Sequence, residues 1–192
     1  MKTIRTLSVL FVIVAFSVST YSQTQWKVDP FHSSLNFSIK HSNISMVNGK
    51  FTDYTGSLST NGDNLENAQF DFTIQAESIN TNVEPRDNHL RSADFFEVEK
   101  YQTLTFKSAK IIKTGKPDKY ILQGKLTIKG VTKDVVFDLD FGGISKSDKG
   151  DKIGFKAKTV INRFDYNVNY DPGALGIGQD VHIVVHLQFG NK

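Results

Sequence analysis

The sequence predicts an all-β protein, an eight-stranded antiparallel barrel with one short capping helix. Three observations support this prediction: apolar and polar residues alternate along eight segments, turn sequences separate many of them, and little of the chain has helical spacing. Alternation places one face of each strand in an apolar environment and the other in water. Because there is too little helix to cover the apolar face, the sheet must close on itself or fold over as a sandwich, and eight long strands favour closure.

The first 22 residues have the segment order of a secretory signal peptide. Lys2 and Arg5 precede an apolar run from Leu7 to Val18, and small and polar residues follow as far as Ser22. This run is shorter than the roughly 20 apolar residues that a membrane-spanning helix needs. We therefore expect cleavage near Ser22, a periplasmic or secreted product without an integral membrane span, and one mature domain over residues 23–192.

Charge and cysteine content limit the possible partners and the means of stabilisation. Removing Lys2 and Arg5 from the 23 basic residues leaves 21, against 20 acidic ones, so the mature domain is close to neutral. A near-neutral domain has no strong field to attract nucleic acid, and we expect no nucleic-acid partner. The chain has no Cys, so burial alone must stabilise the domain, for which about 170 residues are enough.

The eight alternating segments define the predicted strands. The first has Leu35, Phe37 and Ile39 on its apolar face, the second covers residues 51–59, and the third has Phe70, Phe72 and Ile74. The apolar positions of the remaining five are Leu104 and Phe106; Tyr120, Leu122, Leu126 and Ile128; Val135, Phe137, Leu139 and Phe141; Ile153, Phe155, Ala157 and Ile161; and Val181, Ile183, Val185, Leu187 and Phe189.

Four short sequences between these strands have the composition of tight turns, which indicates an antiparallel meander. They are Asn61-Gly62-Asp63, Gly115-Lys116-Pro117-Asp118, Lys129-Gly130 and Ser147-Asp148-Lys149-Gly150. One segment breaks the strand pattern. Asn82 can cap a short helix that runs to about Arg91, with Pro85 in the first turn, where proline is tolerated. Only Val83 and Leu90 give this helix an apolar stripe, so we expect it to cover one end of the barrel.

Short motifs follow one another through the mature domain in a specific order. They include Trp26-Lys27-Val28-Asp29-Pro30-Phe31-His32-Ser33, Arg86-Asp87-Asn88-His89-Leu90 and Gly124-Lys125-Leu126-Thr127-Ile128-Lys129-Gly130. The ordered set resembles the YceI-like family of periplasmic polyisoprenoid-binding proteins. The resemblance implies an extended, lipocalin-like barrel that holds an isoprenoid or another apolar-chain lipid in its bore, for transport, storage or protection. One departure is Asn167, where the family usually has Gly; Asn tolerates the left-handed backbone better than most residues.

The candidate ligand-binding residues are inner-face positions of the predicted strands: Phe37, Ile39, Phe51, Phe72, Ile74, Phe106, Leu122, Gly124, Leu126, Phe137, Leu139, Phe155 and Val185. A filled core is the alternative, because aromatic side chains can occupy a barrel of this size completely. Gly56 and Gly124 favour an open bore, since an inward glycine removes volume where a ligand or another backbone comes close. A β-bulge would explain either glycine equally well. We expect Gly124 to leave room for the ligand.

Histidine and charged residues could indicate a metal site or catalysis. His182 and His186 are four residues apart in a strand, a separation of roughly 13 Å that is too large for one ion. Arg86, Asp87 and His89 lack the partners of a general base, and we expect them to hold the helix on the barrel rim by polar contacts. The sequence therefore predicts no metal, no cofactor and no enzyme activity.

Two other classes of protein fit the same alternation. In a small outer-membrane barrel, the apolar face would point outward and the Lys-rich face would line a narrow lumen. A secreted enzyme acting on a lipid precursor could use the barrel mouth. Pairing of two barrels into a homodimer is also compatible with the sequence.

Overall fold

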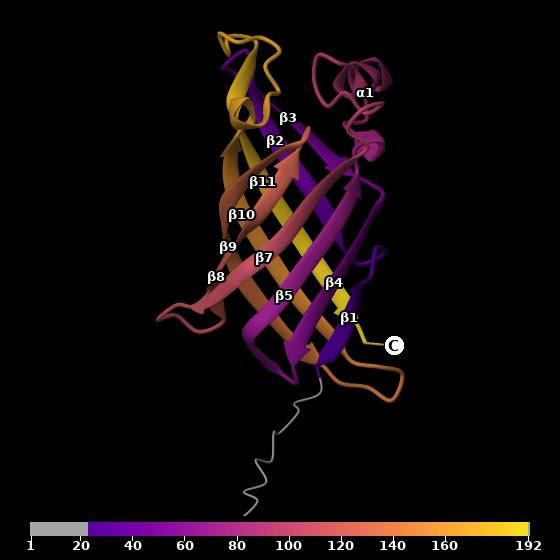
Figure 1. Ribbon diagram of the computed structural model, residues 1–192, viewed down its shortest axis with the longest axis vertical. Helices are drawn as coiled ribbons and strands as arrows, with labels where there is room; N and C mark the ends of the chain where they lie inside the picture. The colour runs from indigo at the N-terminus through magenta and orange to yellow at the C-terminus, as the bar shows by residue number, and fades with distance from the viewer. Residues whose placement is uncertain (1–22, 192) are drawn as a thin grey trace, which may run out of the picture.

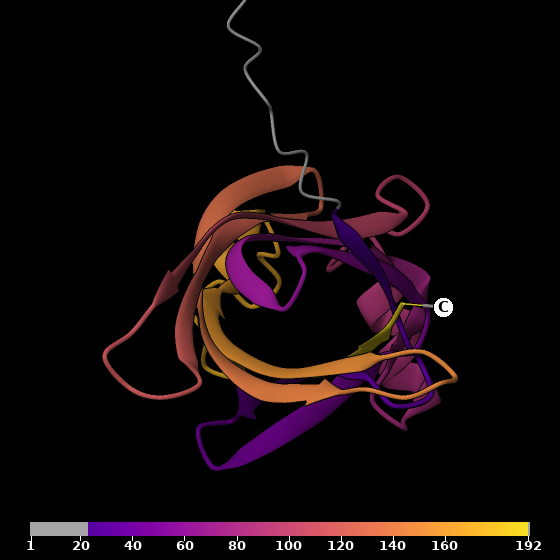
Figure 2. The same cartoon turned by 90° about the horizontal axis from the view of Figure 1, so that it is seen from below.

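The computed structural model describes residues 23–191, and the predicted signal peptide, residues 1–22, lies outside the described residues. Eight strands form a closed antiparallel ring because the first of them pairs with the last. Figure 2 shows this ring along the barrel. In ring order the strands are β1 (Thr24–Val28), β4 (Tyr54–Asn61), β5 (Asn64–Gln75), β7 (Thr103–Lys113), β8 (Lys119–Ile128), β9 (Val131–Ser145), β10 (Lys152–Asn162) and β11 (Ile177–Gly190). The predicted eight-stranded barrel is confirmed.

Three further strands extend one wall toward the end of the barrel that carries the helix (Figure 1). Strand β2 (Ser34–His41) pairs with β11 beyond β1, β3 (Ser45–Phe51) pairs with β2, and β6 (Ile79–Asn80) pairs with β3. The prediction of one strand over residues 51–59 is wrong, because the chain leaves the sheet at Thr52 and Asp53. The amide of Thr52 donates to the carbonyl of Ser78 (3.2 Å), and Asp53 accepts from Gln75 (2.9 Å), so these backbone groups stay paired outside a continuous strand.

All four predicted turns connect adjacent strands of the ring. In the two-residue turn between β8 and β9, Lys129 and Gly130 have φ angles of 48° and 75°. Positive φ at both central positions is the geometry of the type I′ turn, one of the two-residue turns that match the right-handed twist of the strands. The turn sequence therefore sets the register of this hairpin, in which Ile128 pairs with Val131.

The barrel is filled at the end that contains β1. Trp26 is buried there, and its indole Nε1 donates to Thr60 Oγ1 at 2.9 Å. Phe155 lies against Phe70 and Phe189, with ring centroids 5.2 and 6.2 Å apart, in edge-to-face contacts. This end of the barrel is a packed hydrophobic core, as the filled-core alternative expected, and it forms the floor of the space above it.

Helix α1 (Glu84–Arg91) lies at the opposite end of the barrel, as predicted (Figure 1). Its N-cap is Val83 and not Asn82, the residue that the sequence had predicted. The difference comes from the backbone conformation of Asn82. Asn82 adopts a left-handed conformation with φ 61°, and its amide donates to Asn80 Oδ1, which makes it part of the turn before the helix. Two short 3-10 helices, η1 (Ala76–Ser78) and η2 (Arg163–Tyr166), complete the described elements.

Candidate functional site

An apolar cavity of about 1030 Å³ extends from the middle of the barrel to the end that carries α1. Its inner end is formed by core residues such as Phe70 and Leu187, and its outer end by residues such as His41, His89 and Tyr170. The volume lies at the upper end of the range of roughly 300–1,000 Å³ for small-molecule sites. The barrel is therefore packed at one end and hollow at the other.

Most of the predicted ligand-binding residues line this cavity: Phe37, Ile39, Phe51, Phe72, Ile74, Phe106, Leu122, Leu126, Phe137, Leu139 and Val185. They come from seven strands of the wall, β2, β3, β5, β7, β8, β9 and β11. Successive side chains of a strand point to opposite faces, so residues two apart point to the same face. The predicted residues of each strand are an even number of positions apart, and they therefore all face the cavity. The alternation of the sequence thus located the inner wall correctly.

Two predicted residues do not line the cavity. Phe155 belongs to the packed floor, where Phe70 and Phe189 cover its ring. Gly124 faces inward and is buried, but the ring of Phe106 fills the space beside it. A Cβ atom at Gly124 would lie 2.6 Å from that ring and 2.5 Å from the carbonyl oxygen of Lys107. The expectation that Gly124 leaves room for a ligand is therefore wrong, because a neighbouring ring and a close backbone use that room.

Several lining residues were absent from the predicted set. Some lie on strands and follow the same parity, and others lie on segments without alternation, where sequence reasoning had no periodic signal. The first group includes Leu35, Leu104, Ile128, Ala157, Ile161, Val181 and Ile183, and the second includes Phe95, Phe96, Tyr166, Val168 and Tyr170. The Asp94-Phe95-Phe96 motif was one available indication for the second group.

Arg163, at the start of η2, organises the loop that forms one side of the cavity rim. Its side chain is buried, and its guanidinium donates to four backbone carbonyls: those of Gly178 (2.9 Å), Val168 (2.6 Å), Asp171 (3.0 Å) and Ile177 (3.0 Å). Burial lowers the pKa of Arg163, and the nearby charge of Asp171 opposes that change. The planar guanidinium suits this role because it directs several donors at once.

The same loop keeps its shape at the position where the sequence departs from the family pattern. Asn167 has φ 58°, so it occupies the left-handed conformation that a glycine would otherwise supply. Tyr166 next to it lines the cavity and is almost fully buried. Burial, together with the charge of Asp165, raises the pKa of the Tyr166 hydroxyl to about 12. That hydroxyl is neutral at every physiological pH.

Tyr170 joins this loop to the α1 side of the rim. Its ring lies 4.9 Å from the imidazole of His89 and 4.9 Å from the ring of Phe95, measured between centroids. The imidazole is oriented by a 2.8 Å contact between its Nε2 and Asp94 Oδ2. Aromatic contacts of this kind stabilise a rim modestly beyond the area that they bury.

Polar contacts hold α1 on the barrel, as the sequence predicted. The buried carboxylate of Asp87 accepts hydrogen bonds from the amide and the hydroxyl of Thr81. Arg86 donates from Nε to the Thr81 hydroxyl (2.7 Å) and from Nη2 to the Thr81 carbonyl (3.0 Å). Arg91 donates to the carbonyls of Glu77 and Ile79. These groups attach the helix to β6 and the segments that flank it.

The outer face of the barrel is largely polar. His182 and His186 lie exposed on it, and ion pairs such as Lys125 with Asp134 (2.9 Å) and Lys119 with Asp140 (2.8 Å) cross between its strands. This arrangement is the reverse of the one that the outer-membrane alternative requires, in which the apolar face points outward. Within residues 23–191, no helix is long and apolar enough to cross a membrane, and no group of three or more His, Asp or Glu side chains is placed to hold a metal ion.

Comparison with known proteins agrees with this architecture. The model of the YceI-like domain matches residues 26–189. A UPF0312 protein of Staphylococcus aureus strain N315 is 34% identical over 172 residues, which cover 86% of this chain and 97% of the relative. The crystal structure of a Campylobacter jejuni YCEI protein is 35% identical with a TM-score of 0.71, covering 80% of this chain and 90% of that one.

A second solved structure shares the fold at lower identity. It is described as a polyisoprenoid binding domain from Saccharophagus degradans implicated in plant cell wall breakdown, and it is 18% identical with a TM-score of 0.68. The match covers 89% of this chain and all of that domain. The family match spans most of the sequence and follows the same strands that enclose the cavity. The protein therefore belongs to the YceI-like family.

Proposed function

We propose that the protein binds a lipid with a long apolar chain, such as a polyisoprenoid, in the cavity of the barrel. The observation that carries the proposal is the cavity itself, about 1030 Å³ of space with a largely apolar lining above a packed floor. Each methylene that leaves water for such a site contributes about 0.8 kcal/mol. A few prenyl units are therefore enough to offset the entropy lost when the chain is held. Such binding would carry, store or protect a water-insoluble lipid.

Two further observations support this proposal over catalysis. The Saccharophagus degradans domain with the same fold is described as polyisoprenoid binding. At the rim, the polar groups that could act on a substrate already serve the structure: Arg163 binds backbone carbonyls, Asp87 accepts from Thr81, and His89 contacts Asp94. We propose a binding protein rather than an enzyme.

Lipids extracted from the native protein test the proposal directly. The protein would be purified without detergent from its own organism and extracted with organic solvent, and the extract analysed by mass spectrometry. We expect one class of apolar-chain lipid in near-stoichiometric amount. A matched preparation of the Val185→Trp variant, which fills part of the cavity, should carry much less. An empty wild-type protein that also fails to take up added prenyl lipid would refute the proposal.

We also propose that the protein acts outside the cytoplasm after loss of residues 1–22. The support is the segment order of the leader, with Lys2 and Arg5 before an apolar run that is too short to anchor the chain. Mass analysis of protein from the cell-envelope fraction should give an N-terminus near Gln23. An intact Met1 on the envelope-associated product would contradict this localisation.

A further inference from the structure

Three strand glycines face the inside of the barrel at positions where no left-handed φ requires glycine. Gly49 lies in β3, Gly56 in β4 and Gly124 in β8. None of them has the left-handed φ that excludes other residues. A glycine in a strand interior lowers stability and leaves no side chain to pack. Their presence on the inner face therefore needs a reason other than backbone conformation.

Each of the three glycines lies beneath a phenylalanine ring of the neighbouring strand, and Thr81 at Gly49 and the Lys107 carbonyl at Gly124 also lie close. Gly49 pairs directly with Phe37, and Gly56 pairs directly with Phe72. A Cβ atom added at Gly49 would lie 2.3 Å from the Phe37 ring, and one added at Gly56 would lie 2.4 Å from the Phe72 ring. Ordinary contacts begin at 3.4 Å. Each ring thus lies in the space that any side chain on the facing residue would occupy.

These rings also form the surface of the cavity. Phe37, Phe72 and Phe106 all line it, and each lies over one of the three glycines. A ring that lies against the wall projects less far into the bore than a ring held away from the wall by a facing side chain. Because the added Cβ at Gly56 would lie 2.4 Å from the Phe72 ring and ordinary contact begins at 3.4 Å, alanine there would displace the ring by about 1 Å.

We infer that the glycine–phenylalanine pairs set the width of the bore and thereby admit a methyl-branched chain, as in an isoprenoid, and not only a straight one. The inference rests on the proposed lipid binding and specifies the shape of the lipid. An isoprenoid has a wider cross-section than a straight acyl chain because methyl groups project along its length. Narrowing the bore therefore excludes the branched chain before the straight one.

Gly56 offers the cleanest test, since the three atoms nearest to its added Cβ all belong to the Phe72 ring. At Gly124 the added Cβ would also meet the backbone carbonyl of Lys107 at 2.5 Å, so alanine there would disturb the strand itself. Gly154 in β10 is a matched control. The nearest atom to its added Cβ is the carbonyl oxygen of Leu187 at 3.9 Å, so alanine fits there without moving a ring.

The test compares hexadecanoic acid with phytanic acid, which has the same carboxylate and backbone but four methyl branches. Affinities for wild type, Gly56→Ala and Gly154→Ala would be measured by calorimetric titration on delipidated protein. We expect Gly56→Ala to weaken phytanic acid binding tenfold or more while changing hexadecanoic acid binding by less than threefold. Gly154→Ala should bind both acids as the wild type does.

A second variant shows whether the displaced ring causes the loss. Adding Phe72→Leu to Gly56→Ala removes the ring that alanine displaces, so phytanic acid binding should return toward the wild-type value. The double variant also decides the question if Gly56→Ala alone does not fold. Equal weakening for both acids, or no rescue by Phe72→Leu, would overturn the inference while lipid binding stands. A wild-type protein that binds neither acid nor any prenyl lipid would instead refute the proposed function.

Discussion

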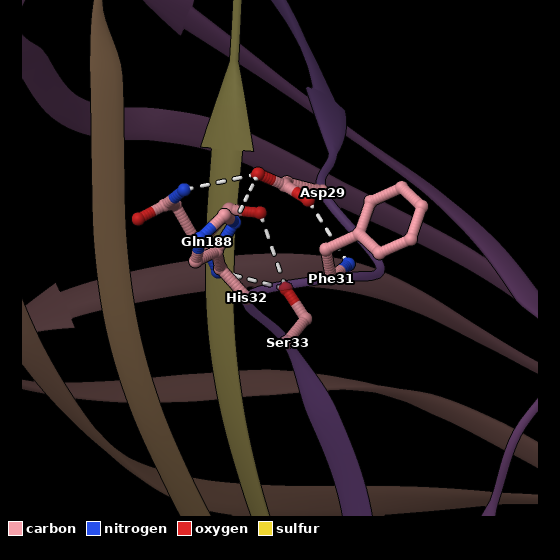
Figure 3. A network of polar contacts seen from close by, with 5 residues as sticks. All are labelled: Asp29, Phe31, His32, Ser33 and Gln188. Atoms are coloured by element: carbon pink, nitrogen blue, oxygen red, sulfur yellow. Dashed lines mark hydrogen bonds and ion pairs between the residues drawn. The ribbon is translucent and has the colours of Figure 1, made fainter.

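The side-chain amide of Gln188 donates a 3.1 Å hydrogen bond to the carboxylate of Asp29, where the barrel closes (Figure 3). The chain passes from β1 to β2 at this point, where the backbone amide of Asp29 still donates to the Gln188 carbonyl (2.8 Å) and Ser33 adds further contacts. The backbone amide of Gln188 donates to Ser33 Oγ (2.9 Å), and Ser33 Oγ donates to the backbone carbonyl of Gln188 (3.2 Å). Only two residue pairs, Lys27 with Gly190 and Val28 with Phe189, join β1 to β11. The Asp29 network therefore adds substantially to the closure.

Removing the Asp29 carboxylate should weaken this closure. The carboxylate accepts from the amide of Phe31 (3.0 Å), from His32 Nδ1 (2.7 Å) and from Gln188. We expect Asp29→Ala to lower the free energy of unfolding by about 2 kcal/mol in urea titrations. Asp63→Ala is the control, because its ion pair with Lys146 is exposed and should contribute little. Equal effects of the two changes would contradict this role for Asp29.

The same carboxylate should make stability depend on pH in acid. Partial burial raises the pKa of Asp29, but hydrogen bonds from His32, Phe31 and Gln188 outweigh it and hold the pKa below its ordinary value. A lowered pKa in the folded state stabilises the protein above about pH 4. That contribution disappears as the pH falls through the lower, folded-state pKa. Urea titrations of wild type and Asp29→Asn between pH 6 and 2 should converge at the acid end; a constant difference would contradict this prediction.

Filling the bore should abolish lipid uptake without unfolding the barrel. Val185 is half-buried and faces the cavity from β11, so the indole of Val185→Trp can extend into open space. We expect the lipid content of purified protein to fall at least several-fold while the urea midpoint changes little. Val136→Trp on the outer face, where Val136 is 52% exposed, should keep its lipid. Loss of lipid from both variants would mean that the cavity is not the binding site.

The attachment of α1 should depend much more on Asp87 than on His89. Asp87 is buried, and its loss leaves the amide and the hydroxyl of Thr81 without their acceptor. We expect Asp87→Ala to lower the free energy of unfolding by about 2–3 kcal/mol and His89→Ala by about 1 kcal/mol or less. Thermal and urea melts would measure both. A larger cost for His89→Ala would show that the rim contacts with Asp94 and Tyr170, and not the Thr81 contacts, hold the helix.

Arg163 should resist even a conservative change. A lysine at this position cannot reproduce the planar set of donors that reaches four carbonyls. We expect Arg163→Lys to lower the free energy of unfolding by about 3 kcal/mol, since buried carbonyls lose their partners. Arg91→Lys, where two carbonyls are involved, should cost less. Comparable losses in the two variants would contradict the importance of the four-carbonyl site.

The sequence was sufficient for the strands that have one buried and one exposed face. Phe70, Phe72 and Ile74 alternate cleanly, and β5 lies where that pattern placed it. It was not sufficient for β1 and β3. Along β3 no residue is fully buried, so its alternation is weak, and its place in the sheet depends on pairing with β2 and β6. Whether such a segment forms a strand depends on contacts with distant segments of the chain, and the local alternation of the sequence carries no information about those contacts.

The cavity too could be predicted only as far as local alternation determines it. Parity along a strand predicts which face a residue occupies, and it placed Ile39 and Leu139 on the inner wall correctly. It does not predict the height of a residue along the barrel, and Phe155 lies in the floor for that reason. Nor does it reveal that Gly124 lies beneath the ring of Phe106. That contact depends on the register between β7 and β8, which shifts between Ser108 and Lys110.

The pairing of β1 with β11 also constrains the order in which the protein can fold. Val28, near the start of the domain, finds its partner Phe189 only after almost the whole domain has been synthesised. Contacts of such long sequence separation form slowly, and unpaired strand edges can aggregate while they wait. A chain that ends before β11 has no closed ring. We therefore expect a truncated chain without β11 to lack both the closing strand and the part of the cavity wall that Ile183 and Val185 supply.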